Sequence, residues 1–454
     1  MFKRNINSWL EKWATNPNRK PLVLRGARQV GKTTAVKQFA RQYDTFLFLN
    51  LEKEEHRKLF EPGPSFSDLL MAIYLINGQT RDNSRTLLFI DEVQNSPQAV
   101  AMLRYFYEEA PQMHVIAAGS LLESLMDKNI SFPVGRVEYV ALRPCAFNEF
   151  LDAIAEPQLA ACIEKGEVPE ILHEKMLGLF NKYTLIGGMP EVVANYAASK
   201  DLVALRTVYD TLLTGYRDDT EKYARNNTQR QVLRHILQSG FSYNCERIKY
   251  ERFGSSDYRS REIGEAFRSL EKTMLLELVW PITGFTPPMI SDIKKSPRLM
   301  WLDSGLVNYA AGVQKEVFGA IDISNIWRGK VAEQIVGQEM IAGETSVIKT
   351  RNFWVREAKN SNAEVDFVMQ HNSIIIPIEV KSGANTRLRS LHLFMEKAPH
   401  DIAIRVWSQP LKIDDLQTDS GKKFRLISIP FYLAGQITKV IDMYYTPAEV
   451  KPPH

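Results

Sequence analysis

Residues 26–33 have the composition and spacing of a loop that binds phosphate groups. They read Gly-Ala-Arg-Gln-Val-Gly-Lys-Thr and match G-x-x-x-x-G-K-[ST] at every fixed position. The glycines let the backbone curl so that successive N–H groups face an anion, and the following helix adds the partial positive charge of its N-terminus. Lys32 is expected to reach the β- and γ-phosphates of ATP, and the Thr33 hydroxyl to bind Mg²⁺. The expected ATP-binding residues are Gly26, Ala27, Arg28, Gln29, Val30, Gly31, Lys32, Thr33 and Thr34.

Two acids follow an apolar segment farther along the chain. Leu87–Ile90 is apolar throughout, and Asp91 and Glu92 come directly after it. In a parallel sheet the carboxyl ends of the strands meet at one edge, so both acids are expected beside the phosphate-binding loop. Asp91 suits the surroundings of Mg²⁺, and Glu92 suits activation of the attacking water. Together the two motifs predict ATP binding and Mg²⁺-dependent ATP hydrolysis.

Alternating strand and helix patterns place these motifs in an α/β fold. The predicted strands are continuous apolar runs, which is typical of parallel strands buried on both faces. Helical patterns separate them, as right-handed βαβ crossovers require. The predicted strands are Pro21–Arg25, Thr45–Leu51, Thr86–Ile90, His114–Ala118 and Val137–Leu142, and the helices are Lys32–Tyr43, Phe66–Ile76 and Pro97–Glu109.

Composition restricts the class of protein. With 44% hydrophobic and 24% charged residues, the 454-residue chain resembles a soluble multidomain protein. The net charge of +4 permits a nucleic-acid partner without requiring one. Cys145, Cys162 and Cys245 have no metal-like spacing and indicate a reducing compartment. No run approaches the roughly 18 apolar residues of a membrane helix, and no signal peptide is evident, so we expect a cytoplasmic protein without a membrane partner.

The two phosphate-site motifs resemble those of the AAA+ superfamily. The loop sequence more closely resembles a branch of ATPases that also carry a C-terminal DUF4143-type domain, which is PD-(D/E)xK nuclease-like. The resemblance implies that Ser120, after strand His114–Ala118, senses the γ-phosphate, and that Arg136, before the last strand, reaches the ATP of a neighbouring subunit. It therefore implies a homo-oligomer, typically a ring of about six. Residues 187–190, Gly-Gly-Met-Pro, resemble the turn of a helical lid.

The middle of the chain resembles a winged helix. Gln229–Gly240 and Arg259–Leu275 have helical spacing, and the β-like Leu275–Pro281 follows them. One face of the second helix is apolar, and the other carries the candidate DNA-binding residues Arg259, Arg261, Arg268 and Lys272. The alternative is an ordinary solvated face, because Glu262, Glu265 and Glu271 cancel much of this charge.

The last part of the chain carries acids and a lysine in the order of a nuclease centre. Glu333 lies on a predicted helix, Asp366 near the start of one strand, and Glu379 and Lys381 at the end of the next. If the strands are antiparallel, Asp366 and Glu379 can share one Mg²⁺, to which Glu333 adds a carboxylate. Lys381 would then orient or deprotonate a metal-bound water. The order resembles the PD-(D/E)xK nuclease fold, although Val365 replaces its proline.

These patterns divide the chain into four expected domains. They are a P-loop AAA+ core with a parallel sheet at 1–144, a helical lid at 145–225, a winged-helix-like segment at 226–318 and a nuclease-like α/β domain at 319–454. The function expected from them is ATP hydrolysis by an oligomer acting on DNA, with ATP and Mg²⁺ as cofactors. The nuclease-like domain either cleaves DNA or only binds it. Two alternatives stay open: a regulatory switch controlled by ATP, and a protein-remodelling ATPase with an inactive nuclease fold.

Overall fold

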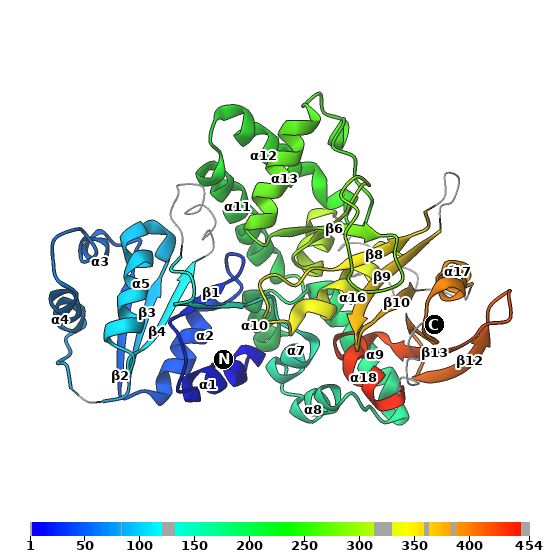
Figure 1. Cartoon of the computed structure of the whole chain (residues 1–454), viewed down its shortest axis with the longest axis horizontal. Coiled ribbons are helices and arrows are strands. Elements are labelled where there is room, and N and C mark those ends of the chain that lie inside the picture. Colours follow the sequence, from blue (N-terminus) through cyan, green and yellow to red (C-terminus); the bar gives the residue numbers. More distant parts are fainter. Residues whose placement is uncertain are drawn as a thin grey trace, which may run out of the picture.

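The protein contains two β-sheets with helices between and above them (Figure 1). The computed structural model describes residues 2–82, 84–119, 132–312, 329–357, 363–382 and 387–445, apart from the side chains of 220–223. Within these residues one sheet has five strands and the other has eight. In the same part of the chain, no helix has both the length and the apolar character needed to cross a membrane.

The N-terminal sheet is parallel throughout and has the strand order β2-β3-β4-β1-β5. Leu22 and Leu24 of β1 pack in one apolar cluster with α1 and α2, whereas Val23 packs in another with α4 and α5. Burial on both faces explains the continuous apolar runs, and the predicted α/β core is confirmed. The elements are α1 Asn5–Thr15, β1 Leu22–Arg25, α2 Lys32–Phe39, β2 Thr45–Asn50, α3 Glu54–Lys58, α4 Phe66–Ile76, β3 Thr86–Asp91, α5 Pro97–Glu109, β4 His114–Gly119 and β5 Glu138–Ala141.

A group of helices connects this sheet to the rest of the molecule. They are α7 Phe147–Ala153, α8 Pro157–Lys165, α9 His173–Ile186, α10 Pro190–Ser199 and α11 Leu205–Tyr223. Helices α8 and α10 begin with Pro157 and Pro190, which suit the first turn because their missing N–H has no partner there. The helix expected at Glu167–Lys182 begins later, at His173, and ends at Ile186; a 3-10 turn at Glu170–Leu172 precedes it.

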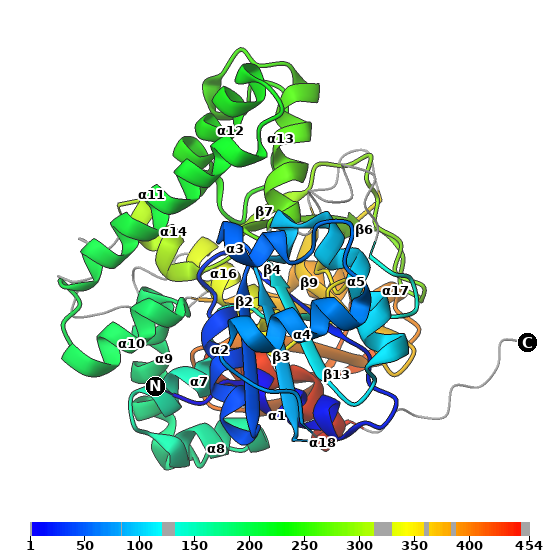
Figure 2. The same ribbon diagram turned by 90° about the vertical axis from the view of Figure 1, so that its left-hand side faces the viewer.

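The middle segment contributes to the second sheet. Helices α12 Asn227–Ser239 and α13 Ser260–Lys272 stand at one end of the molecule in both views (Figures 1 and 2). The antiparallel pair β6 Leu276–Ile282 and β7 Arg298–Trp301 follows them, which is the order expected of a winged helix. However, β6 also pairs in parallel with β8 Asn352–Val355, so this pair forms one edge of the C-terminal sheet.

The C-terminal sheet has the order β12-β13-β11-β10-β9-β8-β6-β7. Strands β9 and β10 form the antiparallel pair expected from the sequence. Helix α16 packs against one face, and α17 covers the other in a separate apolar cluster. The remaining elements are α14 Ser304–Ala310, α16 Lys330–Ala342, β9 Glu364–His371, β10 Ile374–Lys381, α17 Arg389–Lys397, β11 Ile402–Trp407, β12 Lys412–Gln417, β13 Lys423–Pro430 and α18 Ile437–Tyr444.

The turn between α9 and α10 packs against α14 with almost no space between backbones. The Asp303 carboxylate, fully buried, accepts the Gly188 N–H at 2.6 Å and caps α14 through the Leu306 N–H at 3.0 Å. A Cβ at Gly187 would lie 2.2 Å from this carboxylate, and one at Gly188 would lie 2.2 Å from the Cys145 carbonyl oxygen. Glycine is therefore required at both positions for steric reasons.

A second buried carboxylate fixes the same region. Glu339 of α16 accepts hydrogen bonds from the Tyr183 hydroxyl at 2.7 Å and from the Phe147 N–H at 3.1 Å. Burial raises the pKa of Glu339 to about 7, although both hydrogen bonds oppose this shift. Helix α16 is thus bonded to α7 and α9, and one apolar cluster runs from α1 to the C-terminal sheet.

We predict that Gly188→Ala lowers the free energy of unfolding by about 3 kcal/mol or more, because its methyl group would overlap a backbone carbonyl that cannot move alone. Gly215→Ala, in α11, is the matched control: its Cβ would meet no atom within 4 Å, and alanine favours helix by up to about 1 kcal/mol. Chemical denaturation measures both. Equal stability of the two variants would contradict the close contact.

Candidate nucleotide site and acidic cluster

The phosphate-binding loop lies between β1 and α2, as its sequence predicts. Gly26 is essential for packing, because a Cβ there would lie 2.4 Å from the Leu142 carbonyl oxygen. Gly31 has φ of 92°, a left-handed conformation that favours glycine, and it directly precedes α2. The loop backbone is therefore held close to the end of β5 and turned toward the helix N-terminus.

The contacts of Lys32 and Thr33 agree with the roles expected of these side chains. The Lys32 ammonium donates to the carbonyl oxygens of Gly26 at 2.9 Å and Ala27 at 2.8 Å. Burial lowers the pKa of Lys32 to about 8, against the opposing influence of Glu92 and Asp91. The Thr33 hydroxyl donates to the Asp91 carboxylate at 2.7 Å. The structure thus brings the two motifs together, although β4 lies between β1 and β3 in the sheet.

The backbone turns sharply at Glu92, directly after β3. Its φ of 53° is left-handed, which is uncommon outside glycine and asparagine and often marks functional positions. The Gln94 side-chain amide donates to the Glu92 carboxylate. Burial raises the pKa of Glu92, and the neighbouring Asp91 charge adds to this increase. Glu92 lines the cavity beside the loop, where it can orient or accept a proton from a water molecule.

A cavity of about 930 Å³ opens beside the loop and is large enough for a nucleotide. Gly31, Lys32, Thr33 and Thr34 line one side of it. Helix α10, referred to below as the lid, also lines the cavity, through Pro190 and the small residues Ala194, Ala197 and Ala198. The sequence drew attention to the turn at residues 187–190, but the helix that follows this turn was not predicted.

Two arginines near the loop have structural partners. Arg28 forms an ion pair with Asp219 of α11, and its carbonyl oxygen accepts the Tyr216 hydroxyl at 3.0 Å. Arg4, which the sequence did not single out, donates to the Val30 carbonyl at 3.1 Å and to Glu149 of α7 at 3.0 Å. Arg28 also lines the cavity, so it stays a candidate for phosphate contact while bound to α11.

The loop and the β3 acids provide oxygen ligands that suit Mg²⁺. The Thr33 hydroxyl and the Asp91 carboxylate meet at the edge of the cavity, and hard divalent cations prefer such ligands. Burial raises the pKa of Asp91, although the hydrogen bonds from Thr33 and from the Glu92 N–H, and the charge of Lys32, oppose this shift. These residues fit a magnesium ion.

The remaining expected residues of the ATPase core are placed as follows. Arg136 precedes β5, is 43% exposed, and forms an ion pair with Glu108 of α5 at 3.2 Å. Val134, in the same loop, is 87% exposed. Ser120 lies outside the described residues. Arg136 is therefore available at the surface, away from contacts with the phosphate-binding loop of its own chain.

The C-terminal acids gather as the sequence predicts. The Val380 N–H donates to Asp366 at 2.7 Å, which places Asp366 beside Glu379 across the β9–β10 pair. The Lys381 ammonium donates to Glu379 at 2.7 Å. Burial, followed by the charge of Asp366, raises the pKa of Glu333 to about 8 and that of Glu379 to about 7. The charges of these residues therefore influence one another; they are Glu333, Asp366, Glu379 and Lys381.

A buried arginine that sequence reasoning missed lies within this cluster. Arg298, at the start of β7, is 6% exposed at its side chain. It contacts the carboxylates of Glu333 at 3.2 Å and Asp366 at 3.7 Å, and it forms an ion pair with Glu364. It also donates to the Asp366 carbonyl oxygen at 3.0 Å and lies over the Phe353 ring. These acids raise the pKa of Arg298, although its burial acts in the opposite direction.

The cluster as arranged does not fit a metal ion. Across the residues that the structure describes, no three His, Cys, Asp or Glu side chains form a group able to hold one. Two of the three expected ligands, Glu333 and Asp366, take the Arg298 guanidinium as their cation. Glu379 retains one buried oxygen without a hydrogen-bond partner among these residues, but Lys381 occupies its other oxygen. As arranged, the carboxylates of this cluster are therefore neutralised by Arg298 and Lys381 and not by a metal ion.

The basic face of α13 is exposed, as expected. Its inward face carries Ile263, Phe267 and Leu270 in the apolar core. Arg261 is 88% exposed and pairs with Glu265 one turn along, whereas Lys272 borders a pocket between α13 and α16. The four candidate DNA-binding residues Arg259, Arg261, Arg268 and Lys272 are all exposed.

Family models match three parts of the chain. An AAA domain matches residues 18–151, a domain of unknown function (DUF8612) matches 177–317, and another (DUF4143) matches 328–431. The first and last confirm the resemblance seen in the sequence. A search of the curated proteins finds no match.

Solved structures that resemble this chain include a Walker-type ATPase, a branch migration motor and an Hsp104–ADP complex. The Walker-type ATPase PABY2304 of Pyrococcus abyssi is 15% identical, with a TM-score of 0.44, over 68% of this chain and 96% of its own. The RuvB Holliday junction branch migration motor of Thermotoga maritima is 16% identical, with a TM-score of 0.27, over 64% and 92%. The Hsp104–ADP complex of S. cerevisiae is 14% identical, with a TM-score of 0.27, over 59% and 37%.

We predict that Arg298→Met lowers the free energy of unfolding by about 3–5 kcal/mol at neutral pH, because it leaves buried carboxylates without their cation. Removing the cation raises the folded-state pKa of Glu333 further above its wild-type value of about 8, so the variant keeps a proton that the wild-type protein has lost, and the loss should grow as pH rises from about 7 to about 9. Arg247→Met is the control, because Arg247 is 39% exposed and its 3.5 Å contact with Glu364 contributes less than about 1 kcal/mol. A loss that does not depend on pH would contradict this account.

Proposed function

We propose that this chain, which carries an AAA domain at residues 18–151 and a DUF4143 domain at 328–431, hydrolyses ATP as a homo-oligomer that acts on DNA. The hydrogen bond between Thr33 and Asp91 is the observation that carries the ATPase proposal. It joins the two motifs at the edge of a cavity of nucleotide size. The same residues suit Mg²⁺, which when bound supplies positive charge to the β- and γ-phosphates.

Different residues around the cavity bind the phosphates, activate the attacking water and exclude bulk water. The backbone N–H groups of the loop and the start of α2 bind the phosphates, and Lys32 exchanges its loop carbonyl partners for phosphate oxygens. Glu92 orients the attacking water and takes up its proton, and its raised pKa makes it a better base. The α10 face and Phe2 exclude water from the rest of the nucleotide.

We predict that Lys32→Ala abolishes ATP binding and lowers the ATPase rate by about 100-fold or more, because an electrostatic partner of the transferred phosphoryl group is lost. Lys37→Ala is the matched control: Lys37 lies on the same helix, is exposed, and contacts the Phe48 ring instead. Phosphate release measures the rates, and fluorescent nucleotide titration measures binding. Full activity of Lys32→Ala would refute the ATPase assignment.

Surface features beside Arg136 support an oligomer. Arg136 and the apolar Val134 are exposed in the loop before β5. Helix α4, at the far edge of the same domain, exposes Met71 and Leu75 by 61% and 67%. Exposed apolar side chains of this size suit contact with another subunit. We propose that Arg136 leaves Glu108 and contacts the ATP of a neighbouring subunit.

This proposal predicts complementation between inactive variants. Arg136→Ala should lower the ATPase rate by on the order of 10³, because the arginine stabilises charge on the transferred phosphoryl group. Lys32→Ala subunits retain Arg136, so mixing them with Arg136→Ala subunits should restore part of the activity. Wild-type activity of pure Arg136→Ala, or no recovery in mixtures that co-assemble on a sizing column, would exclude an arginine acting between subunits.

The exposed basic face of α13 supports DNA as the partner. Arg261 and Arg268 reach solvent from a helix whose other face is fully packed, so they can contact phosphates without disturbing the core. We propose that the nuclease-like domain contributes binding without cleavage, because Arg298 supplies the cation of its acidic cluster. Mg²⁺-dependent cleavage that is lost in Asp366→Ala would contradict this part of the proposal.

We predict that Arg261→Gln/Arg268→Gln weakens DNA binding and reduces the salt dependence of the binding constant by about 0.9 per lost phosphate contact. Lys58→Gln, an exposed lysine of α3 paired with Glu54, is the control for loss of surface charge. Fluorescence anisotropy at several salt concentrations measures both quantities. An unchanged slope in the double variant would remove α13 from the DNA-binding surface.

A further inference from the structure

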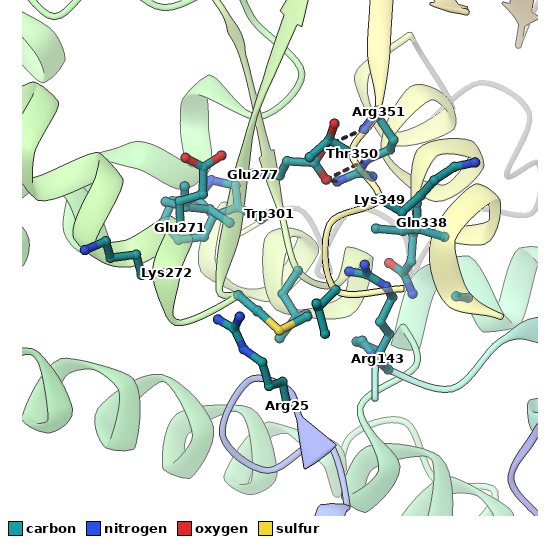
Figure 3. Close-up of a pocket in the computed structure, with 17 residues that line it drawn as sticks. Arg25, Arg143, Glu271, Lys272, Glu277, Trp301, Gln338, Lys349, Thr350 and Arg351 are labelled. Carbon is teal, nitrogen blue, oxygen red and sulfur yellow. Dashed lines mark hydrogen bonds and ion pairs between the residues drawn. The ribbon is translucent and has the colours of Figure 1, made fainter. Parts of the chain in front are cut away.

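A second pocket lies where the ATPase core, the middle segment and the C-terminal domain meet (Figure 3). Its volume is about 300 Å³, at the lower end of the range for small-molecule sites. Three groups of elements form it: the ends of β1 and β5, the α13–β6–β7 segment, and α16 with the loop after it. None of the residues that we assign to ATP hydrolysis lines this pocket.

The pocket is positively charged. Five Lys or Arg residues and two Glu residues line it, for a formal charge of +3; they are Arg25, Arg143, Lys272, Lys349, Arg351, Glu271 and Glu277. Figure 3 shows the guanidinium groups of Arg25 and Arg143 directed from one edge toward the middle, while the ammonium groups of Lys272 and Lys349 lie toward the sides. The two arginines lie at the ends of neighbouring strands. Arg25 is the last residue of β1, and Arg143 comes shortly after β5, which pairs with β1. The Leu142 N–H donates to the Arg25 carbonyl at 2.7 Å.

Arg143 forms no ion pair with a carboxylate in the described part of the chain. It donates to the carbonyl oxygens of Glu344 at 3.4 Å and Ser346 at 3.3 Å, both neutral. Glu277 is bound by Arg351, through its backbone N–H at 2.7 Å and its guanidinium at 3.0 and 2.8 Å. Burial lowers the pKa of Arg143, the charge of Glu277 opposes this shift, and the charge of Arg351 adds to it. A bound anion would stabilise the charged form of Arg143 beyond what Glu277 provides.

The rest of the lining is apolar. Met274, Leu276, Leu302, Ile341 and Val347 face the same space as the two arginines. An inorganic anion could bind to the Arg143 guanidinium but would leave this apolar wall without a partner. A ligand that combines an anionic group with an apolar or aromatic part would satisfy both, as pockets with few polar groups in an apolar lining usually require.

We propose that this pocket binds a small organic phosphate of about nucleoside monophosphate size, with its phosphate between Arg25 and Arg143 and its remaining part against the apolar wall. Guanidinium groups are the preferred partners of phosphate because their paired N–H donors match its oxygens. The ligand would affect the ATP site directly, because Arg25 precedes Gly26 of the phosphate-binding loop. It would also contact α16 through Gln338, which donates to Asp303 at 3.4 Å.

The test is isothermal titration calorimetry on the full-length protein, in which dependence of binding on Arg143, a residue that does not line the ATP cavity, distinguishes this pocket from the ATP site. Adenosine monophosphate, ribose 5-phosphate and inorganic phosphate are the probes. We expect adenosine monophosphate to bind most tightly, and both Arg143→Gln and Arg25→Gln to weaken it about tenfold or more, as loss of a charged hydrogen bond implies. Arg104→Gln, an exposed arginine paired with Glu108 on α5, should bind like its parent.

Three results would overturn the proposal. The first is no binding of any of the three probes at millimolar concentration by protein whose circular dichroism shows it to be folded. The second is equal affinity in Arg143→Gln, Arg25→Gln and Arg104→Gln. The third is binding, dependent on Arg143, of a short single-stranded oligonucleotide but not of the mononucleotide, which would assign the pocket to the DNA path. Each result is independent of whether the protein hydrolyses ATP.

Discussion

The buried carboxylate of Asp303 fixes the turn on which the nucleotide cavity depends. It accepts N–H groups from Gly188 and Leu306, and the Gln338 amide also reaches it. Burial raises its pKa to about 6, against the effect of these hydrogen bonds, so the contact is made at an electrostatic cost and requires its donors to stay in place. Helix α10, whose small residues face the ATP cavity, begins two residues after Gly188. The lid is thereby attached to the C-terminal half of the chain.

Helix α16 extends this attachment to the acidic cluster. At one end Glu333 contacts Arg298, and farther along Gln338 and Glu339 bond to Asp303 and Tyr183. These side chains project from one 13-residue helix that is packed in the same apolar cluster as the lid. A displacement of the lid on nucleotide binding would therefore have to move α16 or break buried hydrogen bonds, and the latter is costly. This gives a physical route by which ATP could influence the C-terminal domain.

The sequence predicted those features that depend on local pattern. The loop at 26–33, the strand before Asp91 and the exact bounds of α4 and α5 follow from motif spacing, apolar runs and a proline at the first helical turn. The features it missed depend on contacts between distant residues. Arg298 follows an ordinary Lys-Lys-Ser-Pro loop, and only the pairing of β7 with β6 brings it to Glu333 and Glu364. Likewise, the winged-helix pattern did not indicate that β6 would join the C-terminal sheet. This pairing depends on β8, a segment far along the chain, and not on the sequence around β6.

Our central proposal is that the site formed by Thr33, Asp91 and Glu92 hydrolyses ATP, and that the protein acts on DNA as an oligomer. Steady-state ATPase rates of the wild-type protein and of Glu92→Gln, with and without single-stranded, duplex and branched DNA, test it most directly. The account predicts turnover by the wild-type protein that at least one DNA structure accelerates, and tight nucleotide binding without turnover by Glu92→Gln. Wild-type protein that binds ATP but hydrolyses it no faster than Glu92→Gln, whatever DNA is present, would contradict it.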